Sequence, residues 1–420
     1  MGSDWTGWLR QRAKSLPADA AQLAALALGA QVAVAAGVIG VDAIRKSRTT
    51  EMHQAPDTPP RELEVSTNHL TTYTYGAHVY DAMLTAINEA TDYIYFASYI
   101  WKGDEVGQQF KDAFIEAANR GVTVCLVFDG FANLVVPKEF KTFPDNVEVL
   151  QFPTVRYFAF VDVRRTGRDH RKMLIVDGDV GFVGGYNIGS LYATQWRDTH
   201  VRLQGEAVWE LENTFVDFWN RHKRRGLADL PDSGTPSWDP AIRAARNEPS
   251  RIVYPVRGLY LEAIDRATES IWITQAYFIP DREIQEGLMS AAARGVDVRV
   301  ILPQRSNHVI ADVVSRSYFA TLLAGGVRLF MYQDAMVHAK TATVDGKWTT
   351  VGTANIDRLS LTGNYEVNLQ ILDREQAGVM QDIFRHDLIN CEELTLKMWE
   401  ERTLVHRGAE FMLKPLHPLL

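Results

Sequence analysis

Cysteine is almost absent from the 420-residue sequence, which contains only Cys125 and Cys391, far apart in apolar segments. This scarcity excludes a disulfide framework and a zinc cluster built on cysteine. Basic charge is not in excess either, because 44 Lys and Arg stand against 52 Asp and Glu, for a formal net charge of −8. Broad binding to nucleic acid needs a basic surface that neutralises phosphates, so no nucleic-acid partner is expected. A local basic pocket remains compatible with this composition.

The sequence also lacks the bias of disordered or fibrous proteins. Hydrophobic residues make up 46% of it and charged residues 23%, which is the balance of a globular protein. A chain of this length is too long for one ordinary core and suits two domains of ordinary size.

One stretch near the N-terminus is nearly free of polar side chains. Residues 20–41 contain only Gln22 and Gln31 as polar residues, and as a helix they would be about 33 Å long, enough to cross a bilayer core of roughly 30 Å. The stretch has three interpretations: a membrane anchor, a helix on the protein surface, or a cleaved signal peptide. We prefer an anchor within residues 1–50, followed by a proline-containing linker over residues 51–68.

One sequence pattern occurs twice in the remaining chain. Residues 86–101 and 263–280 each read as the end of a helix followed by a β-branched and aromatic run typical of a buried strand. An amphipathic helix and a second apolar strand follow in both copies, with Gly121 or Gly295 at the left-handed C-cap position of the helix. The expected helices are 108–120 and 282–294, and the expected strands are 122–128 and 296–302. Strand, helix and strand with short connections form a βαβ unit.

The fold class predicted from this repeat is α/β, with two similar domains. We expect the first domain over residues 69–228, an inter-domain linker over 229–250, and the second domain over 251–420. Each domain should be a mixed or largely parallel sheet flanked by helices. Duplication also predicts an approximate twofold axis, with one shared active site where equivalent loops meet.

A spaced set of polar residues recurs in the two halves. His170 and His338 are each followed by Lys at +2, Asp at +7, Gly at +14, Asn at +17 and a carboxylate at +28. The members are Lys172, Asp177, Gly184, Asn187 and Asp198 in the first half, and Lys340, Asp345, Gly352, Asn355 and Glu366 in the second. Two matched copies inside an independently found repeat indicate a site rather than a pair of surface motifs.

These residue types suit a phosphodiester. Two histidines, two lysines and two asparagines around one point form a cationic cradle rich in hydrogen-bond donors. A neutral imidazole can attack phosphorus while a protonated imidazole serves as the acid for the leaving group. The predicted catalytic residues are His170, Lys172, Asp177, His338, Lys340 and Asp345, and the predicted phosphate-binding residues are Asn187, Asn355, Thr353 and Arg168. No metal and no cofactor are expected, because no cluster of three or more carboxylates or histidines is evident.

The carboxylates of the set have two interpretations. Asp198 and Glu366 are expected to hold the second ring nitrogen of each histidine and to fix its tautomer. Asp177 and Asp345 share the motif of the catalytic residues, but each stands in a hairpin-type turn. A turn aspartate that bonds local backbone accounts for both without any reaction, and we favour that structural role.

The tandem pattern His-x-Lys-x4-Asp-x6-Gly resembles the phospholipase D superfamily over roughly residues 70–400. Within it, residues 168–172, residues 196–200 and the closing Pro418-Leu419-Leu420 resemble bacterial cardiolipin synthases. The resemblance implies two phospholipase D-like domains and a phosphohistidine intermediate, with His170 as nucleophile and His338 as acid. It further implies a phosphatidyltransferase that joins two phosphatidylglycerol molecules into cardiolipin and glycerol. The implied partners are phospholipid and membrane, and the implied location is the bacterial inner membrane, held by the N-terminal anchor.

Two positions depart from the family pattern. Gly185 and Thr353 stand where serine is frequent in the family, so the first half offers no hydroxyl there. Three other functions stay open: a phospholipase D that forms phosphatidic acid, a nuclease or other phosphodiesterase of the superfamily, and an inactive scaffold or lipid-binding protein. The acidic composition argues against the nuclease, and the two intact motifs argue against an inactive protein.

Overall fold

A computed structural model describes residues 54–154, 167–232, 234 and 239–402 of the chain. The candidate anchor 20–41 and the closing tripeptide lie outside these residues. Within the described ranges, no helix combines the length and the apolar character needed to cross a membrane.

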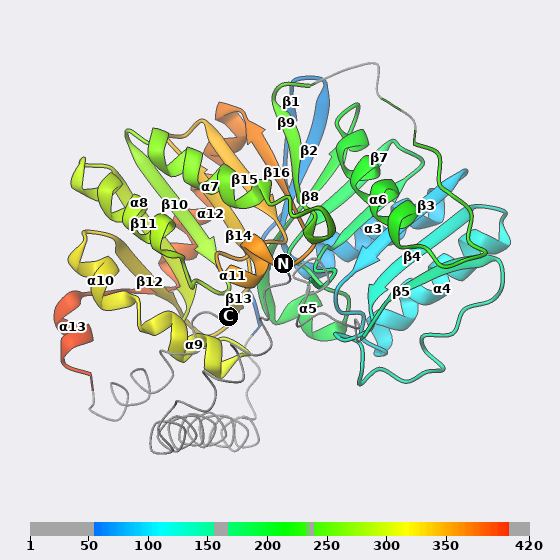
Figure 1. Cartoon of the computed structure of the whole chain (residues 1–420), viewed down its shortest axis with the longest axis horizontal. Coiled ribbons are helices and arrows are strands. Elements are labelled where there is room, and N and C mark those ends of the chain that lie inside the picture. The colour runs from blue at the N-terminus through cyan, green and yellow to red at the C-terminus, as the bar shows by residue number, and fades with distance from the viewer. Residues whose placement is uncertain (1–53, 155–166, 233, 235–238, 403–420) are drawn as a thin grey trace, which may run out of the picture.

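The first half is built on a nine-stranded mixed sheet (Figure 1). Its strands run in the order β1-β2-β8-β7-β6-β3-β4-β5, and β13 from the second half joins it by pairing with β8. Their bounds are β1 (Arg61–Val65), β2 (Asn68–Tyr75), β3 (Tyr93–Ser98), β4 (Thr123–Asp129), β5 (Val147–Phe152), β6 (Met173–Val176), β7 (Val180–Gly184), β8 (Trp196–Gln204) and β13 (Met336–Val337). Strands β3, β4 and β5 are parallel, whereas β6, β7, β8 and β2 pair antiparallel.

The second half repeats this arrangement in an eight-stranded sheet of order β17-β12-β11-β10-β14-β15-β16-β9. The bounds are β9 (Ile242–Asn247), β10 (Ser270–Gln275), β11 (Asp297–Pro303), β12 (Arg328–Tyr332), β14 (Lys340–Val344), β15 (Trp348–Gly352), β16 (Glu366–Leu372) and β17 (Cys391–Leu394). Parallel β10, β11 and β12 take the places of β3, β4 and β5, and antiparallel β14, β15 and β16 take those of β6, β7 and β8. The predicted duplication of an α/β unit is therefore confirmed.

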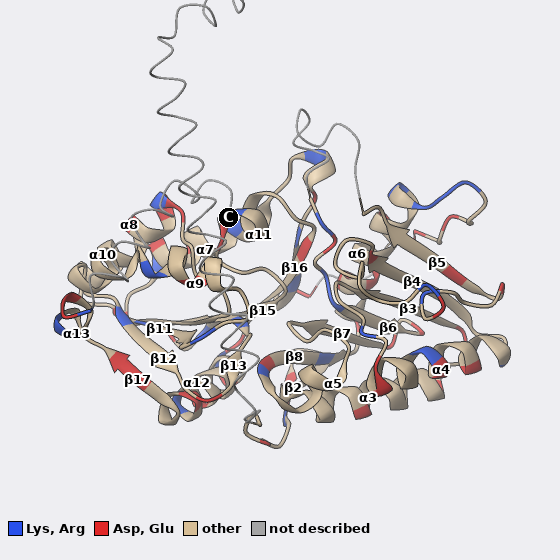
Figure 2. Ribbon diagram, turned by 90° about the horizontal axis from the view of Figure 1, so that it is seen from below, with Lys and Arg blue, Asp and Glu red and all other residues tan. Residues whose placement is uncertain are grey.

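Helices cover both faces of each sheet, as Figure 2 shows. In the first half α3 (Gly76–Glu89) and α4 (Glu105–Asn119) pack on one face and α6 (Val208–His222) on the other. In the second half α7 (Pro255–Arg266), α8 (Arg282–Ala293) and α10 (Phe319–Ala324) face α12 (Arg374–Ile389) across the sheet. The shorter helices are α5 (Ser190–Thr194), α9 (Val309–Arg316), α11 (Arg358–Thr362), α13 (Leu396–Glu400) and the 3₁₀ turn η2 (Pro249–Arg251).

The residues at the ends of α4 and α8 explain why the repeated helix could be recognised in the sequence. Asp104 and Asp281 cap the two helices by accepting hydrogen bonds from the N–H groups of Gly107 and Ile284. Each helix ends before a glycine with positive φ, 97° at Gly121 and 94° at Gly295. These two glycines confirm the predicted left-handed C-caps.

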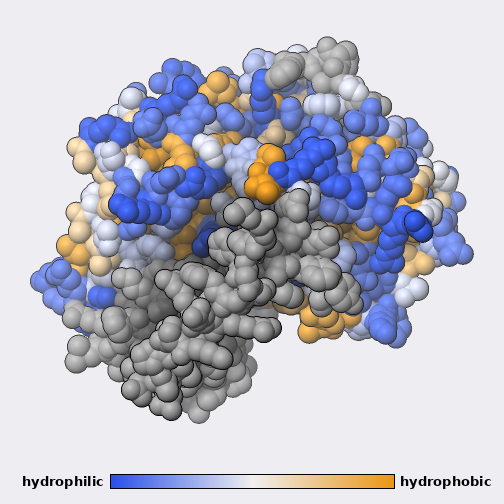
Figure 3. All heavy atoms as spheres, viewed as in Figure 1, coloured by the Kyte–Doolittle hydropathy of each residue, from blue (hydrophilic) through white to orange (hydrophobic). Residues whose placement is uncertain are grey.

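The two halves share a core. One buried cluster includes Val183 and Val201 from the first half together with Val351 and Val367 from the second. Strand β9 lies inside the range 229–250 expected to be a linker and pairs with β16. The proposed domain boundaries stay a prediction. The face seen in Figure 3 is largely hydrophilic, with hydrophobic residues in separate patches.

Candidate active site between the two halves

Both predicted histidines lie just before a central antiparallel strand. His170 precedes β6, which pairs antiparallel with β3, and His338 precedes β14, which pairs antiparallel with β10. The start of an antiparallel strand lies beside the end of its neighbour, so each histidine stands at the carboxyl edge of the parallel strands.

Each histidine segment pairs with the other half of the molecule. A parallel bridge joins Asp169 to Tyr365, and the N–H of His170 donates to the carbonyl of Tyr365 at 3.0 Å. In the same way β13 runs parallel to β8 with Val337 opposite Arg197, and the N–H of His338 donates to the carbonyl of Arg197 at 2.7 Å. The residues that follow these pairs are therefore neighbours across the junction.

The histidine–carboxylate pairs are consequently exchanged between the halves. Nδ1 of His170 lies 2.9 Å from Oε2 of Glu366, and Nδ1 of His338 lies 2.6 Å from Oδ2 of Asp198. Counting +28 from each histidine associates His170 with Asp198 and His338 with Glu366, so the structure corrects that association. The parallel pairing of each motif with the other half is the physical reason.

Burial dominates the electrostatics of these four groups. Glu366 is 0% exposed, Asp198 1% and His338 5%. Burial raises the pKa of Glu366 to about 8 and that of Asp198 to about 6. Burial, with the nearby charges of Lys172 and Lys340, lowers the pKa of both histidines well below its ordinary value. Without a ligand, both imidazoles are accordingly neutral near pH 7.

The two lysines lie beside the histidines. Nζ of Lys172 donates to the carbonyl of His170 at 2.6 Å. Nζ of Lys340 contacts the carbonyl of His338 and lies 3.0 and 3.1 Å from its ring nitrogens. Burial lowers the pKa of Lys172 to about 7 and that of Lys340 to about 8. An anion beside a lysine favours the charged form of its amine, so both lysines are suited to bind an anion.

The motif aspartates stand apart from this cluster. Asp177 accepts hydrogen bonds from the N–H groups of Thr91, Asp92 and Tyr93 and from the hydroxyl of Thr91. Asp345 accepts the same set from residues 268–270. Both carboxylates bind backbone N–H groups, as the turn interpretation expects. These N–H groups, however, belong to the segment that leads into β3 or β10 and not to the hairpin turn that contains the aspartate. Both aspartates thus join the hairpin to the sheet.

The two asparagines differ in their surroundings. The amide oxygen of Asn187 accepts a hydrogen bond from the N–H of Ile100 at 3.1 Å, and its carbonyl accepts one from the hydroxyl of Tyr80. Asn355 is 4% exposed, and its amide oxygen has no hydrogen-bond partner in the described structure. Of the two amide oxygens, that of Asn355 is the one without a partner in the described structure.

Two expected phosphate contacts have other partners. The hydroxyl of Thr353 donates to Glu366 at 2.6 Å, so Thr353 holds the carboxylate that in turn holds His170. The guanidinium of Arg168 donates to the carbonyl of Pro153 at 2.8 Å and lies over the ring of Phe131. Their role as phosphate contacts stays a prediction.

Gly185 explains one departure from the family pattern. A Cβ atom at this position would lie 2.1 Å from Oδ1 of Asp198. The carboxylate therefore fills the space that a serine side chain would need. A glycine is required here because Asp198 approaches the backbone so closely.

Aromatic rings around the histidines were not predicted from the sequence. The ring of Tyr99 meets His170 edge-on with centroids 4.6 Å apart, and Trp196 lies 4.8 Å from His338. Tyr277 also faces His338, at 6.2 Å. Tyr99 directly follows β3, whereas Tyr277 is the second residue after β10, so the two rings come from corresponding loops but not from equivalent positions of the repeat.

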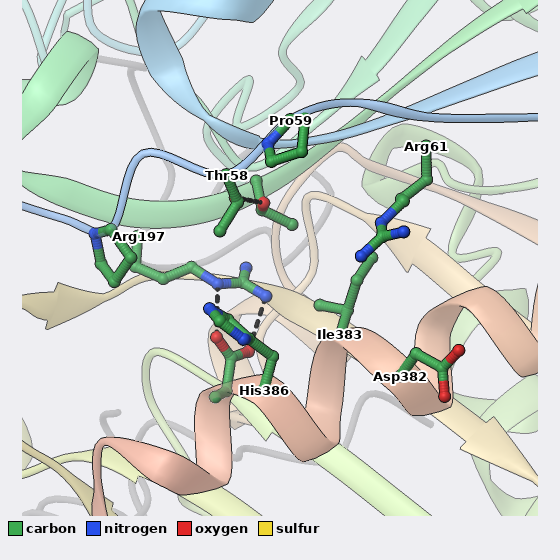
Figure 4. A pocket seen from close by; sticks show the side chains of 10 residues that line it. Thr58, Pro59, Arg61, Arg197, Asp382, Ile383 and His386 are labelled. Atoms are coloured by element: carbon green, nitrogen blue, oxygen red, sulfur yellow. Dashed lines mark hydrogen bonds and ion pairs between the residues drawn. The ribbon is translucent and has the colours of Figure 1, made fainter.

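A buried ion pair supports the junction behind His338. Arg197 binds Asp387 of α12 through two hydrogen bonds, of 3.0 and 2.6 Å, and also donates to the carbonyl of Asp198 at 2.8 Å. A cavity of about 120 Å³ opens beside the pair. Figure 4 shows Arg197 reaching toward α12, which carries Asp382, Ile383 and His386 along one wall, with Thr58 and Pro59 opposite.

Within the described ranges, no three His, Cys, Asp or Glu side chains gather in a way that could hold a metal ion. The histidines, carboxylates and lysines of the site are themselves the groups that can carry out chemistry. Two neutral imidazoles are each bound to a carboxylate through Nδ1. Nε2 of His338 lies 3.1 Å from Nζ of Lys340, and the two lysines supply positive charge beside the imidazoles.

A family model described as "Cardiolipin synthase, PLD-like domain" matches residues 83–219 and 260–388. The chain is 33% identical to the major cardiolipin synthase ClsA of Bacillus subtilis, over 84% of this chain and 76% of that protein. It is 32% identical to cardiolipin synthase 1 of Bacillus anthracis, over 83% of this chain and 72% of that protein.

Solved structures show the same fold at low sequence identity. The phosphatidylserine synthase of Haemophilus influenzae superposes with a TM-score of 0.63 at 15% identity, covering 86% of this chain and 95% of that one. The polyphosphate kinase of Porphyromonas gingivalis gives a TM-score of 0.54 at 14% identity, over 84% of this chain and 53% of that one.

Proposed function

The chain belongs to the cardiolipin synthase family of phospholipase D-like phosphatidyltransferases, and we propose that it transfers a phosphatidyl group from one phosphatidylglycerol to another, giving cardiolipin and glycerol. The observation that supports this reaction most is the pair of exchanged histidine–carboxylate contacts, at 2.9 and 2.6 Å, with a buried lysine beside each histidine. The same side chains form one shared site from both halves.

In the proposed first step, His170 attacks the phosphorus of the donor lipid. Glu366 accepts a hydrogen bond from Nδ1–H of His170, which leaves the lone pair on Nε2 for the attack. A bond forms between Nε2 and phosphorus, and the bond from phosphorus to the glycerol oxygen breaks. The bound phosphodiester anion raises the pKa of His338, which takes up a proton from solvent. His338, then protonated and bound to Asp198, gives its Nε2 proton to the departing glycerol.

The proposed second step reverses the proton transfer. His338, now neutral, takes the proton of a free hydroxyl on the second phosphatidylglycerol, and that oxygen attacks phosphorus. The bond between phosphorus and His170 breaks, and cardiolipin leaves. Lys172 and Lys340 bind the non-bridging oxygens in both steps, because a phosphodiester anion between them raises the pKa of both amines and favours their charged form.

We also propose a location at the bacterial inner membrane. The support is the apolar stretch of residues 20–41 in the sequence and the lipid nature of the proposed substrate. Removal of residues 1–50 should reduce the share of the protein that sediments with membranes, measured by fractionation beside the full chain.

The test of the reaction is a product analysis by mass spectrometry. The purified full chain is supplied with phosphatidylglycerol as the sole lipid in detergent micelles, with His170→Ala and His338→Ala as inactive controls. We expect cardiolipin and glycerol in equal amounts. Phosphatidic acid without cardiolipin would contradict the transferase and establish a hydrolytic phospholipase D.

A further inference from the structure

Exposed hydrophobic side chains gather in the loop that follows β4. Ten large hydrophobic residues are exposed in the described structure, and three of them lie within five positions of this loop. Phe131 is 52% exposed, Leu134 58% and Val135 83%. We call these three residues the apolar loop. Scattered exposed hydrophobics are ordinary, but a group on one loop indicates a contact surface.

The apolar loop is held in place by buried polar side chains. Asp129 is 0% exposed and accepts hydrogen bonds from the N–H groups of Phe131 and Ala132, at 2.9 and 3.0 Å. Asn133 is 1% exposed, and its amide nitrogen donates to the carbonyl of Asp129 at 2.8 Å. The structure thus presents the hydrophobic side chains to solvent on a fixed frame.

The same frame is connected to the candidate active site. The amide nitrogen of Asn133 also donates to the carbonyl of Tyr99 at 2.8 Å, and the ring of Tyr99 contacts His170. Asp129 also accepts a hydrogen bond from the N–H of Asp169, the residue before His170, at 3.2 Å. The apolar loop therefore lies at the carboxyl edge of β4, the edge at which His170 stands beside β3.

Basic side chains accompany the apolar loop. The guanidinium of Arg168 lies 5.0 Å from the centre of the Phe131 ring. Lys138 is exposed and Lys141 donates to the carbonyl of Asn133 at 2.9 Å, whereas Glu139 is the one acidic residue between positions 131 and 142. Apolar tips beside positive charge suit the surface of an anionic lipid bilayer.

We propose that the apolar loop inserts into the surface of an anionic bilayer and holds the active-site edge against the membrane that supplies the lipid. This inference rests on the proposed function, because only a lipid substrate requires that edge to meet a membrane. The described core then has a membrane contact of its own, separate from the N-terminal stretch.

The first test measures insertion without reference to activity. A nitroxide-sensitive fluorophore is attached to Leu134→Cys in the full chain, with Cys391→Ser to remove the partly exposed thiol. The matched control is Leu372→Cys, because Leu372 is also 58% exposed but lies at the end of β16 that is far from Glu366. Both proteins are placed in phosphatidylglycerol vesicles that contain spin-labelled lipid.

We expect strong quenching of the label at position 134 and little quenching at position 372. Equal quenching at the two positions would overturn the docking surface, even if cardiolipin is formed. Shielding of the 134 label before vesicles are added would overturn it too, because another part of the chain or a second copy would then cover the loop.

The second test uses the double variant Leu134→Ser/Val135→Ser with Leu372→Ser as control. Loss of this apolar area should lower the rate on vesicle phosphatidylglycerol at least tenfold. The rate on a short-chain, monomeric phosphatidylglycerol should stay within twofold, since the site itself is intact. An equal loss on both substrates would overturn the proposal, and an absence of cardiolipin in every protein would instead overturn the proposed function.

Discussion

Each catalytic histidine is paired with a carboxylate from the other half of the chain, and the order of residues in the sequence does not suggest these pairs. Glu366 holds His170, and Asp198 holds His338. A carboxylate on Nδ1 keeps the proton on that nitrogen and directs Nε2 toward the substrate. The spacing in the sequence identified all four residues, but the exchange of partners follows from strand pairing between the halves, which no spacing within one copy encodes.

Gly185→Ala should disable the site by displacing Asp198. The added Cβ would lie 2.1 Å from Oδ1 of Asp198, so the carboxylate must move away from His338. A displacement of about 1 Å at a catalytic group typically costs about 100-fold in rate, and we expect at least that loss in initial rates of cardiolipin formation. Gly258→Ala, where a Cβ meets nothing within 4 Å, is the control. A fully active Gly185→Ala protein would show that the contact between Asp198 and His338 is dispensable.

Asp177→Ala should lower stability and largely spare catalysis. Asp177 accepts four hydrogen bonds from residues 91–93, and their loss should cost about 2 kcal/mol of unfolding free energy. Asp179→Ala, an exposed aspartate two positions away, is the control and should change stability little. Thermal unfolding with rates per folded molecule measures both effects. A large rate loss with unchanged stability would assign Asp177 to the reaction.

The pH dependence of that loss has a definite sign. Partial burial raises the pKa of Asp177, but hydrogen bonds from Thr91, Tyr93 and Asp92 outweigh it and leave the pKa below its ordinary value. A lowered pKa stabilises the fold above the unfolded value of about 3.9 and loses that contribution as the pH falls through the folded pKa. The difference between Asp177→Ala and the unmodified chain should therefore be full at pH 7 and shrink in acid.

Secondary-structure elements meet at the junction through β8 and α12. Arg197 of β8 and Asp387 of α12 form an ion pair in which both side chains are buried. Asp387→Ala leaves the arginine charge without its partner, and such losses typically cost about 3–5 kcal/mol. We expect a clear fall in the midpoint of thermal unfolding. Asp382→Ala, on an exposed position of the same helix, should change it little. Equal midpoints for the two variants would contradict a supporting role for the pair.

Much of the order of helices and strands could be predicted from the sequence. Periodicity and helix caps located α4 and α8 to within a few residues, and the same glycines ended both. Strand β9 was missed, because a polar segment rich in turn residues precedes it and its own sequence, Ile242–Asn247, has a weak apolar alternation. It becomes a strand through its pairing with β16, a contact between distant parts of the chain.

At the scale of the whole molecule, duplication explains the site. Each half alone supplies a histidine without the carboxylate that holds it, so only the joined halves complete both pairs. The sequence predicted this shared location from the repeat. Thr353 and Arg168 have partners inside the protein that their residue types did not suggest, a carboxylate and a backbone carbonyl, and their role as phosphate contacts stays a prediction. The N-terminal anchor and the domain limits stay predictions.

The most direct test of the two-histidine account uses a phosphatidyl ester of p-nitrophenol, whose leaving group needs no proton. His338→Ala lacks only the acid and the later base, so it should release about one equivalent of p-nitrophenolate in a burst and keep the phosphatidyl group on the chain. Asp198→Asn should behave like His338→Ala. His170→Ala should give no burst because the nucleophile is lost, and Glu366→Gln should give none because the orientation of the nucleophile is lost. A normal burst from His170→Ala would contradict the account.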